Sequence, residues 1–271
     1  MPTSLDLDAH GDGIGSAATV LRENARLAGV DAPVPTVPAW SVGDLVLHTG
    51  LVHRWADAIL RGVPPETAGE IDLPVADAVR REAGFVGVEP FDWYDAQVTA
   101  LLQTLAFAPP DLDVFFFLKD APPARMAWAR RQSHETTMHA VDAMAARLGR
   151  VPSVSEVWVR SPHAVDGIDE LLTGFVPRRK QTLRSDAPWL LPVEATDTGH
   201  AWRLEISEDP VMTTVLPPTA DRPTTDARLP RCRGAAVPLY LTLWNRAVDD
   251  SAEEISDRAA LEQWRSQMRV I

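Results

Sequence analysis

The stretch RRQSHETTMHAVDA, residues 130–143, lies inside the longest helix that the sequence predicts, residues 124–148. Four polar side chains of this stretch are three or four residues apart and therefore share one helix face: Arg131, Glu135, His139 and Asp142. Glu135 and His139 can bind one cation together, because a carboxylate oxygen and an imidazole nitrogen at this spacing reach the same point beside the helix. A catalytic zinc ion has three protein ligands and one open position, so a third ligand is expected from another helix.

A second helix, from Ser41 to about Arg61, offers that third ligand. Ser41 followed three residues later by Asp44 is a capping-box pattern with an acidic residue in the third place. Both His48 and His53 lie on apolar faces of this helix. Their spacing does not choose between them.

Simpler interpretations of the same residues remain open. Glu135 can pair with Arg131 on a solvated face, although Arg before Glu is the weaker orientation of this pair. Either histidine of the second helix can be a core histidine with a satisfied ring. The stretch also differs from the HExxH motif of zinc proteases, because the histidine that follows His134 and Glu135 comes one residue too late.

The pattern of the first 176 residues predicts four or five helices joined by short proline-rich loops. Antiparallel bundling is the natural packing for such helices. A proline pair and an apolar run at 114–118 predict a connection or a short strand. The expected helices are 13–29, 41–61, a weaker segment at 74–83, 90–106, 124–148 and 162–175.

The pattern changes after Pro177. A short basic connector, residues 178–184, is expected to be a solvated linker. Beyond it the apolar residues alternate as in strands, and two helical stretches close the chain: 189–195, 201–206 and 211–216 as strands, 235–247 and 252–268 as helices. The chain is therefore predicted to be α+β with two domains, a helix bundle over 1–178 and a small α+β domain over 184–271.

Composition excludes several classes of function. The chain has 271 residues, of which 45% are hydrophobic and 24% charged, enough to bury a sizeable core. Its net charge of -12 argues against nucleic acid as the main partner. No apolar run approaches the length of a membrane span, and the first residues are acidic and glycine-rich, unlike a signal peptide. A cytoplasmic location without a membrane or nucleic-acid partner is expected.

The single cysteine, Cys232, excludes intramolecular disulfides and cysteine-rich zinc sites. It is flanked by Arg231 and Arg233, and we interpret it as incidental rather than as a nucleophile.

Several segments together resemble the mycothiol-dependent maleylpyruvate isomerase family, which belongs to the DinB-like superfamily of metal-binding helix bundles. The resemblance extends over nearly the whole chain. It rests on PAWSVGDLVLHTGLVHRWA at 38–56, RRQSHETTMHAVDA at 130–143, HAVDGIDELLTGFVPR at 163–178 and RGAAVPLYLTLWNRA at 233–247.

This resemblance implies a divalent metal, usually zinc, held by a histidine of the second helix and by an E-x-x-x-H motif. The matching residues are His48, Glu135 and His139, so the resemblance selects His48 over His53. It implies mycothiol as the small-molecule thiol that attacks an electrophilic substrate. Residues expected near the metal are Asp44, Trp55, Arg131 and Asp142. A C-terminal arginine of the family helps to bind an acidic substrate, and four candidates stay open: Arg222, Arg228, Arg231 and Arg233.

Three functions follow as hypotheses. The leading one is a zinc-dependent enzyme that activates a thiol, as an isomerase or S-transferase. The second is a zinc-water hydrolase, which needs Asp44, Asp142 or His134 as a general base. The third is a non-catalytic DinB-like protein that binds a metal or a ligand. Neither the substrate nor the oligomeric state can be predicted from these residues.

Overall fold

The computed structural model of the chain describes residues 5–69, 90–217, 232–247, 254–255 and 258–268. It contains two compact units, residues 2–152 and 153–271. Within the described residues, no helix combines the length and the apolar character needed to cross a bilayer.

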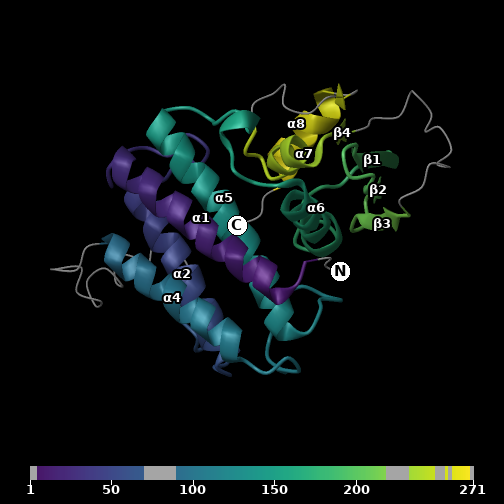
Figure 1. Ribbon diagram of the computed structural model, residues 1–271. Coiled ribbons are helices and arrows are strands. Elements are labelled where there is room, and N and C mark those ends of the chain that lie inside the picture. The colour runs from purple at the N-terminus through teal and green to yellow at the C-terminus, as the bar shows by residue number, and fades with distance from the viewer. Residues whose placement is uncertain (1–4, 70–89, 218–231, 248–253, 256–257, 269–271) are drawn as a thin grey trace. The chain divides into compact units, whose positions relative to one another are not determined.

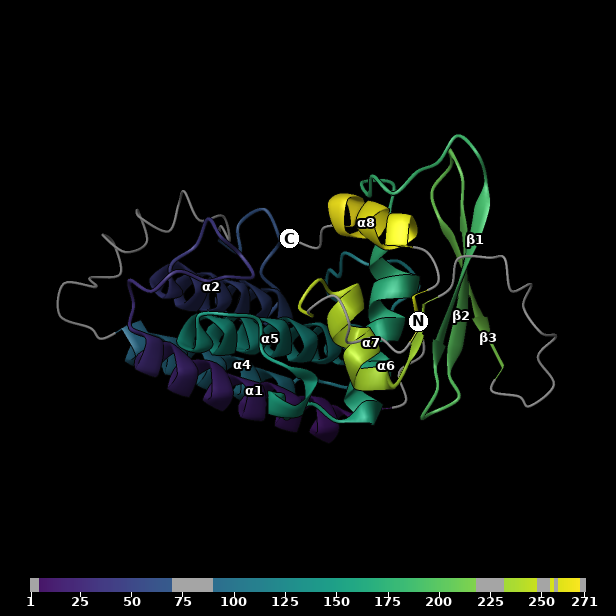
Figure 2. The same cartoon turned by 90° about the horizontal axis from the view of Figure 1, so that it is seen from above.

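The N-terminal unit is a bundle of long helices that lie side by side (Figures 1 and 2). Helix α1 packs along α5, and α2 packs against both α4 and α5. The predicted bundle is confirmed, while the segment at 74–83 lies outside the described residues and 114–118 is a connection without a strand. The helices are α1 (Leu7–Ala28), α2 (Val42–Leu60), α4 (Pro90–Phe107) and α5 (Ala124–Leu148).

Local chemistry explains where these helices begin. Helix α1 starts earlier than the sequence pattern predicted, because the Asp6 side chain caps it by accepting a hydrogen bond from the backbone N–H of Ala9. The predicted capping box of α2 is present: Ser41 accepts from the Asp44 backbone, and the Asp44 carboxylate accepts from Ser41. This cap fixes the phase of α2 and hence the direction of its side chains.

Helices α2 and α4 approach closely at one glycine. A Cβ atom at Gly50 would overlap the indole ring of Trp93 on α4. With the Trp93 ring in this place, any side chain at residue 50 would require the ring to move, so the absence of a Cβ lets the two helices pack at this distance.

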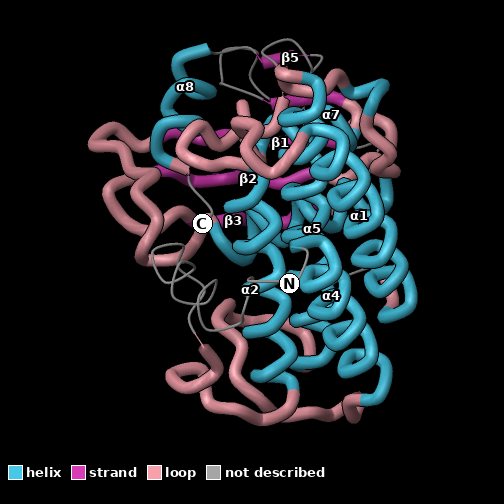
Figure 3. Tube along the Cα trace, turned by 90° about the vertical axis from the view of Figure 1, so that its left-hand side faces the viewer, coloured by secondary structure: helices cyan, strands magenta, loops and turns pink. Residues whose placement is uncertain are grey.

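The C-terminal unit combines helices with one sheet, as predicted (Figures 2 and 3). The strand order is β3-β2-β1-β4-β5, with β1 parallel to β4 and the other neighbours antiparallel. Its strands are β1 (Trp189–Ala195), β2 (Ala201–Ile206), β3 (Met212–Leu216), β4 (Cys232–Gly234) and β5 (Glu254–Ile255). Its helices are η1 (Val154–Glu156), α6 (Ser161–Asp169), the π-helix η2 (Glu170–Phe175), α7 (Ala236–Leu243) and α8 (Arg258–Gln267).

Helices α6 and α7 pack together beside the sheet, and hydrogen bonds from tryptophans tie the layers to one another. The indole N–H of Trp202 on β2 donates to Asp169 of α6, and that of Trp244 donates to the Gly167 carbonyl oxygen. Because α6 packs with α7, the compact C-terminal unit begins at Ser153, whereas the sequence pattern had grouped everything up to residue 178 with the bundle.

Candidate metal centre

Helices α2 and α5 bring three potential metal ligands together inside the bundle. The Glu135 Oε1 atom is 3.1 Å from Nε2 of His139 and 3.5 Å from Nε2 of His48. All three donor atoms lie within 4.8 Å of one another, and this is the one such group among the described residues. Two atoms that are each about 2 Å from a tetrahedral zinc ion are about 3.3 Å apart, so donor types and spacing both fit zinc.

Arg131 controls how Glu135 presents its carboxylate. The buried guanidinium of Arg131 donates a hydrogen bond of 2.9 Å to Glu135 Oε2, which leaves Oε1 facing the two histidines. Burial alone would raise the pKa of Glu135, but hydrogen bonds from His139 and His48 and the charge of Arg131 hold this pKa well below its ordinary value. Glu135 is therefore an anion, and its Oε1 atom lies beside both histidines, where a shared cation would bind.

Asp142 holds the other side of the His139 ring. Its Oδ2 atom is 3.0 Å from His139 Nδ1, and its Oδ1 atom accepts a hydrogen bond from the Thr36 hydroxyl. Burial alone would lower the pKa of His139, but hydrogen bonds with Asp142 and Glu135 raise it to about 9. Without a cation, the cluster thus keeps a proton between His139 and Glu135.

The loop before α2 covers the cluster with an aromatic ring. The ring centroid of Trp40 lies 4.7 Å from that of His48 and 5.8 Å from that of His139. The sequence analysis missed both Trp40 and Thr36, because they lie in a proline-rich loop where no helical or strand period indicates direction. The one available signal was that Trp40 directly precedes the cap of α2.

His53, the alternative third ligand, lies elsewhere in the core. Its ring is fully buried, with Nδ1 2.7 Å from Gln132 Oε1 and Nε2 3.4 Å from the Thr136 hydroxyl. Burial lowers the pKa of His53 to about 4, so the ring is neutral at physiological pH. It is a core histidine with satisfied nitrogens.

The other expected pocket residues have structural partners. Asp44 closes the α2 capping box. Trp55 packs against the rings of Trp128 and Phe115 in an aromatic cluster. His134 is fully buried, with its ring centroid 6.2 Å from that of His10.

The candidates from the C-terminal region are only partly described. Cys232 is buried in β4, and burial raises the pKa of its thiol to about 12, which makes it a poor nucleophile. Arg233 is half exposed and lies 3.5 Å from Glu194 in an ion pair. The remaining candidates, Arg222, Arg228 and Arg231, lie outside the described residues.

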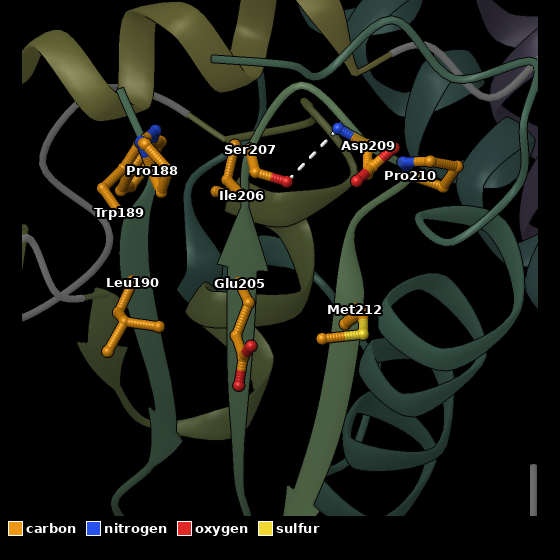
Figure 4. A pocket seen from close by; sticks show the side chains of 9 residues that line it. All are labelled: Pro188, Trp189, Leu190, Glu205, Ile206, Ser207, Asp209, Pro210 and Met212. Atoms are coloured by element: carbon orange, nitrogen blue, oxygen red, sulfur yellow. Dashed lines mark hydrogen bonds between the residues drawn. The ribbon is translucent and has the colours of Figure 1, made fainter. Parts of the chain in front are cut away.

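A hollow of about 310 Å³ lies on the sheet of the C-terminal unit. Figure 4 shows Leu190, Glu205 and Met212 in a row across its three strands. Its lining is mainly apolar and brings together no group of metal-type ligands among the described residues.

Comparisons with known proteins agree with this architecture. Residues 14–144 match the family model described as the mycothiol maleylpyruvate isomerase N-terminal domain. Two solved structures are similar, a mycothiol-dependent maleylpyruvate isomerase and a histidine-to-alanine mutant of a protein with the same description, with TM-scores of 0.55 and 0.56. They are 14% and 13% identical, and each match covers 92% of this chain and 94% of the other. At such identities the likeness shows a shared fold, and no curated protein sequence matches significantly. The predicted resemblance is confirmed.

Proposed function

Because residues 14–144 match the model of the mycothiol maleylpyruvate isomerase N-terminal domain, we propose that this chain is a metal-dependent enzyme that uses a small-molecule thiol. The observation that carries the proposal is the convergence of His48, Glu135 and His139 on one point between two helices. All three are the residues that the family resemblance selects.

Zinc is the proposed metal. Two imidazole nitrogens and one carboxylate oxygen form a ligand set typical of catalytic zinc, and their separations of 3.1 and 3.5 Å suit tetrahedral geometry. A zinc ion held here supplies Lewis-acid chemistry that lowers the pKa of a thiol, so that a thiolate is available at neutral pH. Glu135 contributes the one negative charge among the ligands, and Arg131 offsets that charge through the second carboxylate oxygen.

The proposed thiol is mycothiol and the proposed reaction is isomerisation at a carbon–carbon double bond. A thiolate adds to an electrophilic double bond, the new single bond rotates, and the thiolate leaves, so the thiol is regenerated and no other reactant is consumed. The thiol must come from outside the chain, because Cys232 is buried and protonated. The related structures are described as acting on maleylpyruvate, and an unsaturated acid of this kind is the proposed substrate class.

No observation favours hydrolysis. Each base that a hydrolase would need has another partner: Asp44 in the helix cap, Asp142 with Thr36 and His139, and His134 buried beside His10. A cytoplasmic location belongs to the proposal, because a thiol cofactor is kept reduced there.

Metal analysis is the first test. Protein purified without metal-affinity resin is expected to contain about one zinc per chain, and the Glu135→Ala and His139→Ala variants are expected to contain none. His53→Gln is the matched control, because it changes a buried histidine outside the cluster and should retain the metal. Wild-type protein that takes up no zinc even when it is supplied would leave only the non-catalytic interpretation.

Thiol dependence is the second test. Turnover of a cis-unsaturated keto acid is expected only when a thiol is added. Turnover without added thiol would instead favour a hydrolase or another class of enzyme.

A further inference from the structure

Backbone hydrogen bonds join the two ends of the loop between α1 and α2. Its backbone bonds join Val34 N–H to the Trp40 carbonyl oxygen at 3.0 Å and Val42 N–H to the Ala32 carbonyl oxygen at 2.9 Å, and Pro33 forms a bridge with Ser41. These bonds close the loop at its base, so the residues between them have a defined place beside α5. Thr36 lies among those residues.

From this loop, Thr36 reaches the acid that orients a metal ligand. The Thr36 hydroxyl donates to Oδ1 of Asp142 at 2.5 Å, and Oδ2 of Asp142 is 3.0 Å from Nδ1 of His139. A carboxylate accepts hydrogen bonds and does not donate them, so Nδ1 of His139 carries a hydrogen that it donates to Asp142. The other nitrogen, Nε2, is 3.1 Å from Glu135 Oε1, and a metal bound at Nε2 would displace the proton between these two atoms.

We propose that Thr36 is a positioning residue of this metal centre, acting through Asp142 to fix the tautomer and the ring orientation of His139. Asp142 is fully buried, and a carboxylate in such a place is held in one orientation by its donors. Thr36 fixes one oxygen and thereby directs the other oxygen to the ring. Trp40, from the same loop, lies near the His139 ring, with the two ring centroids 5.8 Å apart. The inference rests on the proposed function, since it assumes that His139 binds a metal.

The bundle offers a matched control for this hydrogen bond. Thr104 of α4 donates its hydroxyl to Oδ1 of Asp57 on α2, also at 2.5 Å and also partly buried. Removing either hydroxyl should lower the stability of the bundle by a similar amount. Only the Thr36 hydroxyl is connected to a candidate ligand.

The experiment measures the affinity for zinc, by competition with a chelator, in wild type and in Thr36→Val, Thr36→Ser and Thr104→Val. We expect Thr36→Val to weaken zinc binding about 10-fold, the low end of the range for losing the direct partner of a metal-bound histidine, because Thr36 acts through that partner, Asp142. Thr36→Ser keeps the hydroxyl and should stay within about threefold of wild type. Thr104→Val should bind zinc like wild type.

Cobalt(II) in place of zinc gives a spectroscopic readout, because its visible absorption depends on ligand geometry. The bands should change in Thr36→Val and stay unchanged in Thr36→Ser and Thr104→Val. If Thr36→Val does not fold, Asp142→Asn carries the same expectation of weakened zinc binding.

Three results would overturn the inference. The first is that Thr36→Val, or its substitute Asp142→Asn, binds zinc as tightly as wild type and gives the same cobalt bands. The second is that Thr104→Val weakens zinc binding as much as Thr36→Val, which would make the effect one of general stability. Both results leave the proposed function standing. Wild-type protein that binds neither metal would instead overturn the proposed function, and the inference with it.

Discussion

Two histidines of helix α2, five residues apart, have opposite chemical environments. His48 meets the carboxylate of Glu135 on α5, whereas His53 meets the amide oxygen of Gln132 on the same helix. His48 remains slightly exposed and shares its partner with His139, while His53 is fully buried and its pKa is lowered to about 4. The partner on α5, rather than the apolar face of α2, decides which histidine becomes a candidate ligand.

The largest difference between the two histidines is expected when each is replaced by alanine. His48→Ala should weaken zinc binding at least about 100-fold, because one of three protein ligands is lost. It should cost little stability, since a partly exposed side chain is removed. His53→Ala should keep the zinc affinity but lower the free energy of unfolding by about 3 kcal/mol, because it leaves a cavity and an unpaired amide.

Chelator competition and urea unfolding of the two variants measure these quantities side by side. If both variants lost zinc to the same extent, the contrast between the histidines would be wrong.

A second prediction concerns the effect of pH on stability. The pKa of His53 is about 4 in the folded protein and near 6.5 when unfolded, so the unfolded chain binds the proton first as the pH falls. The stability contribution is present above pH 6.5 and is lost as the pH falls toward 4. A shift of this size corresponds to about 3 kcal/mol.

Urea unfolding between pH 4 and 7 tests this against His53→Gln, which removes the titrating ring and retains every other titrating group. Over that range, wild type should lose more stability than the variant. Parallel curves for the two proteins would contradict the assigned pKa.

A third prediction concerns Gln132, the partner of His53 on α5. Gln132→Glu gives His53 a carboxylate in the place where His48 has one, and a nearby negative charge favours the protonated ring. The pKa of His53 should rise by about one unit or more above its value in the wild type. Histidine NMR titration of both proteins measures the shift, and an unchanged titration would show that burial alone governs this ring.

The smallest effect is expected at Cys232, the buried thiol of β4. Cys232→Ser should leave the thiol-dependent turnover per folded molecule unchanged, because the protonated, buried thiol supplies no nucleophile. Initial rates at saturating thiol, corrected for the folded fraction, test this. A loss of turnover of more than about tenfold would require a role for this residue.

Helical period and capping chemistry made much of the bundle predictable from sequence. Residues 124–148 were assigned correctly, and Glu135 and His139 share a face as their spacing required. Helical periodicity could not distinguish His48 from His53 as the third ligand, because both lie on apolar faces of their helix. Their partners belong to a helix that is distant in sequence. The family resemblance supplied that choice.

What the sequence could not provide depends on contacts between distant segments. Thr36 and Trp40 reach the cluster through loop geometry that no repeat encodes. The parallel pairing of β1 with β4 joins strands separated by several elements, and local alternation predicts strands but not their order. The π-helix η2 was expected as ordinary helix, because the extra residue per turn leaves no local compositional mark.

The close approach at Gly50 has a consequence for how this sequence can vary. Because the Trp93 ring occupies the space of a Cβ, a side chain at position 50 would have to displace the ring. Gly50 and Trp93 therefore restrict how α4 can pack against α2. His48 lies on the same helix, about half a turn from Gly50. In an alignment of relatives, positions 50 and 93 should covary, with larger residues at one matched by smaller residues at the other.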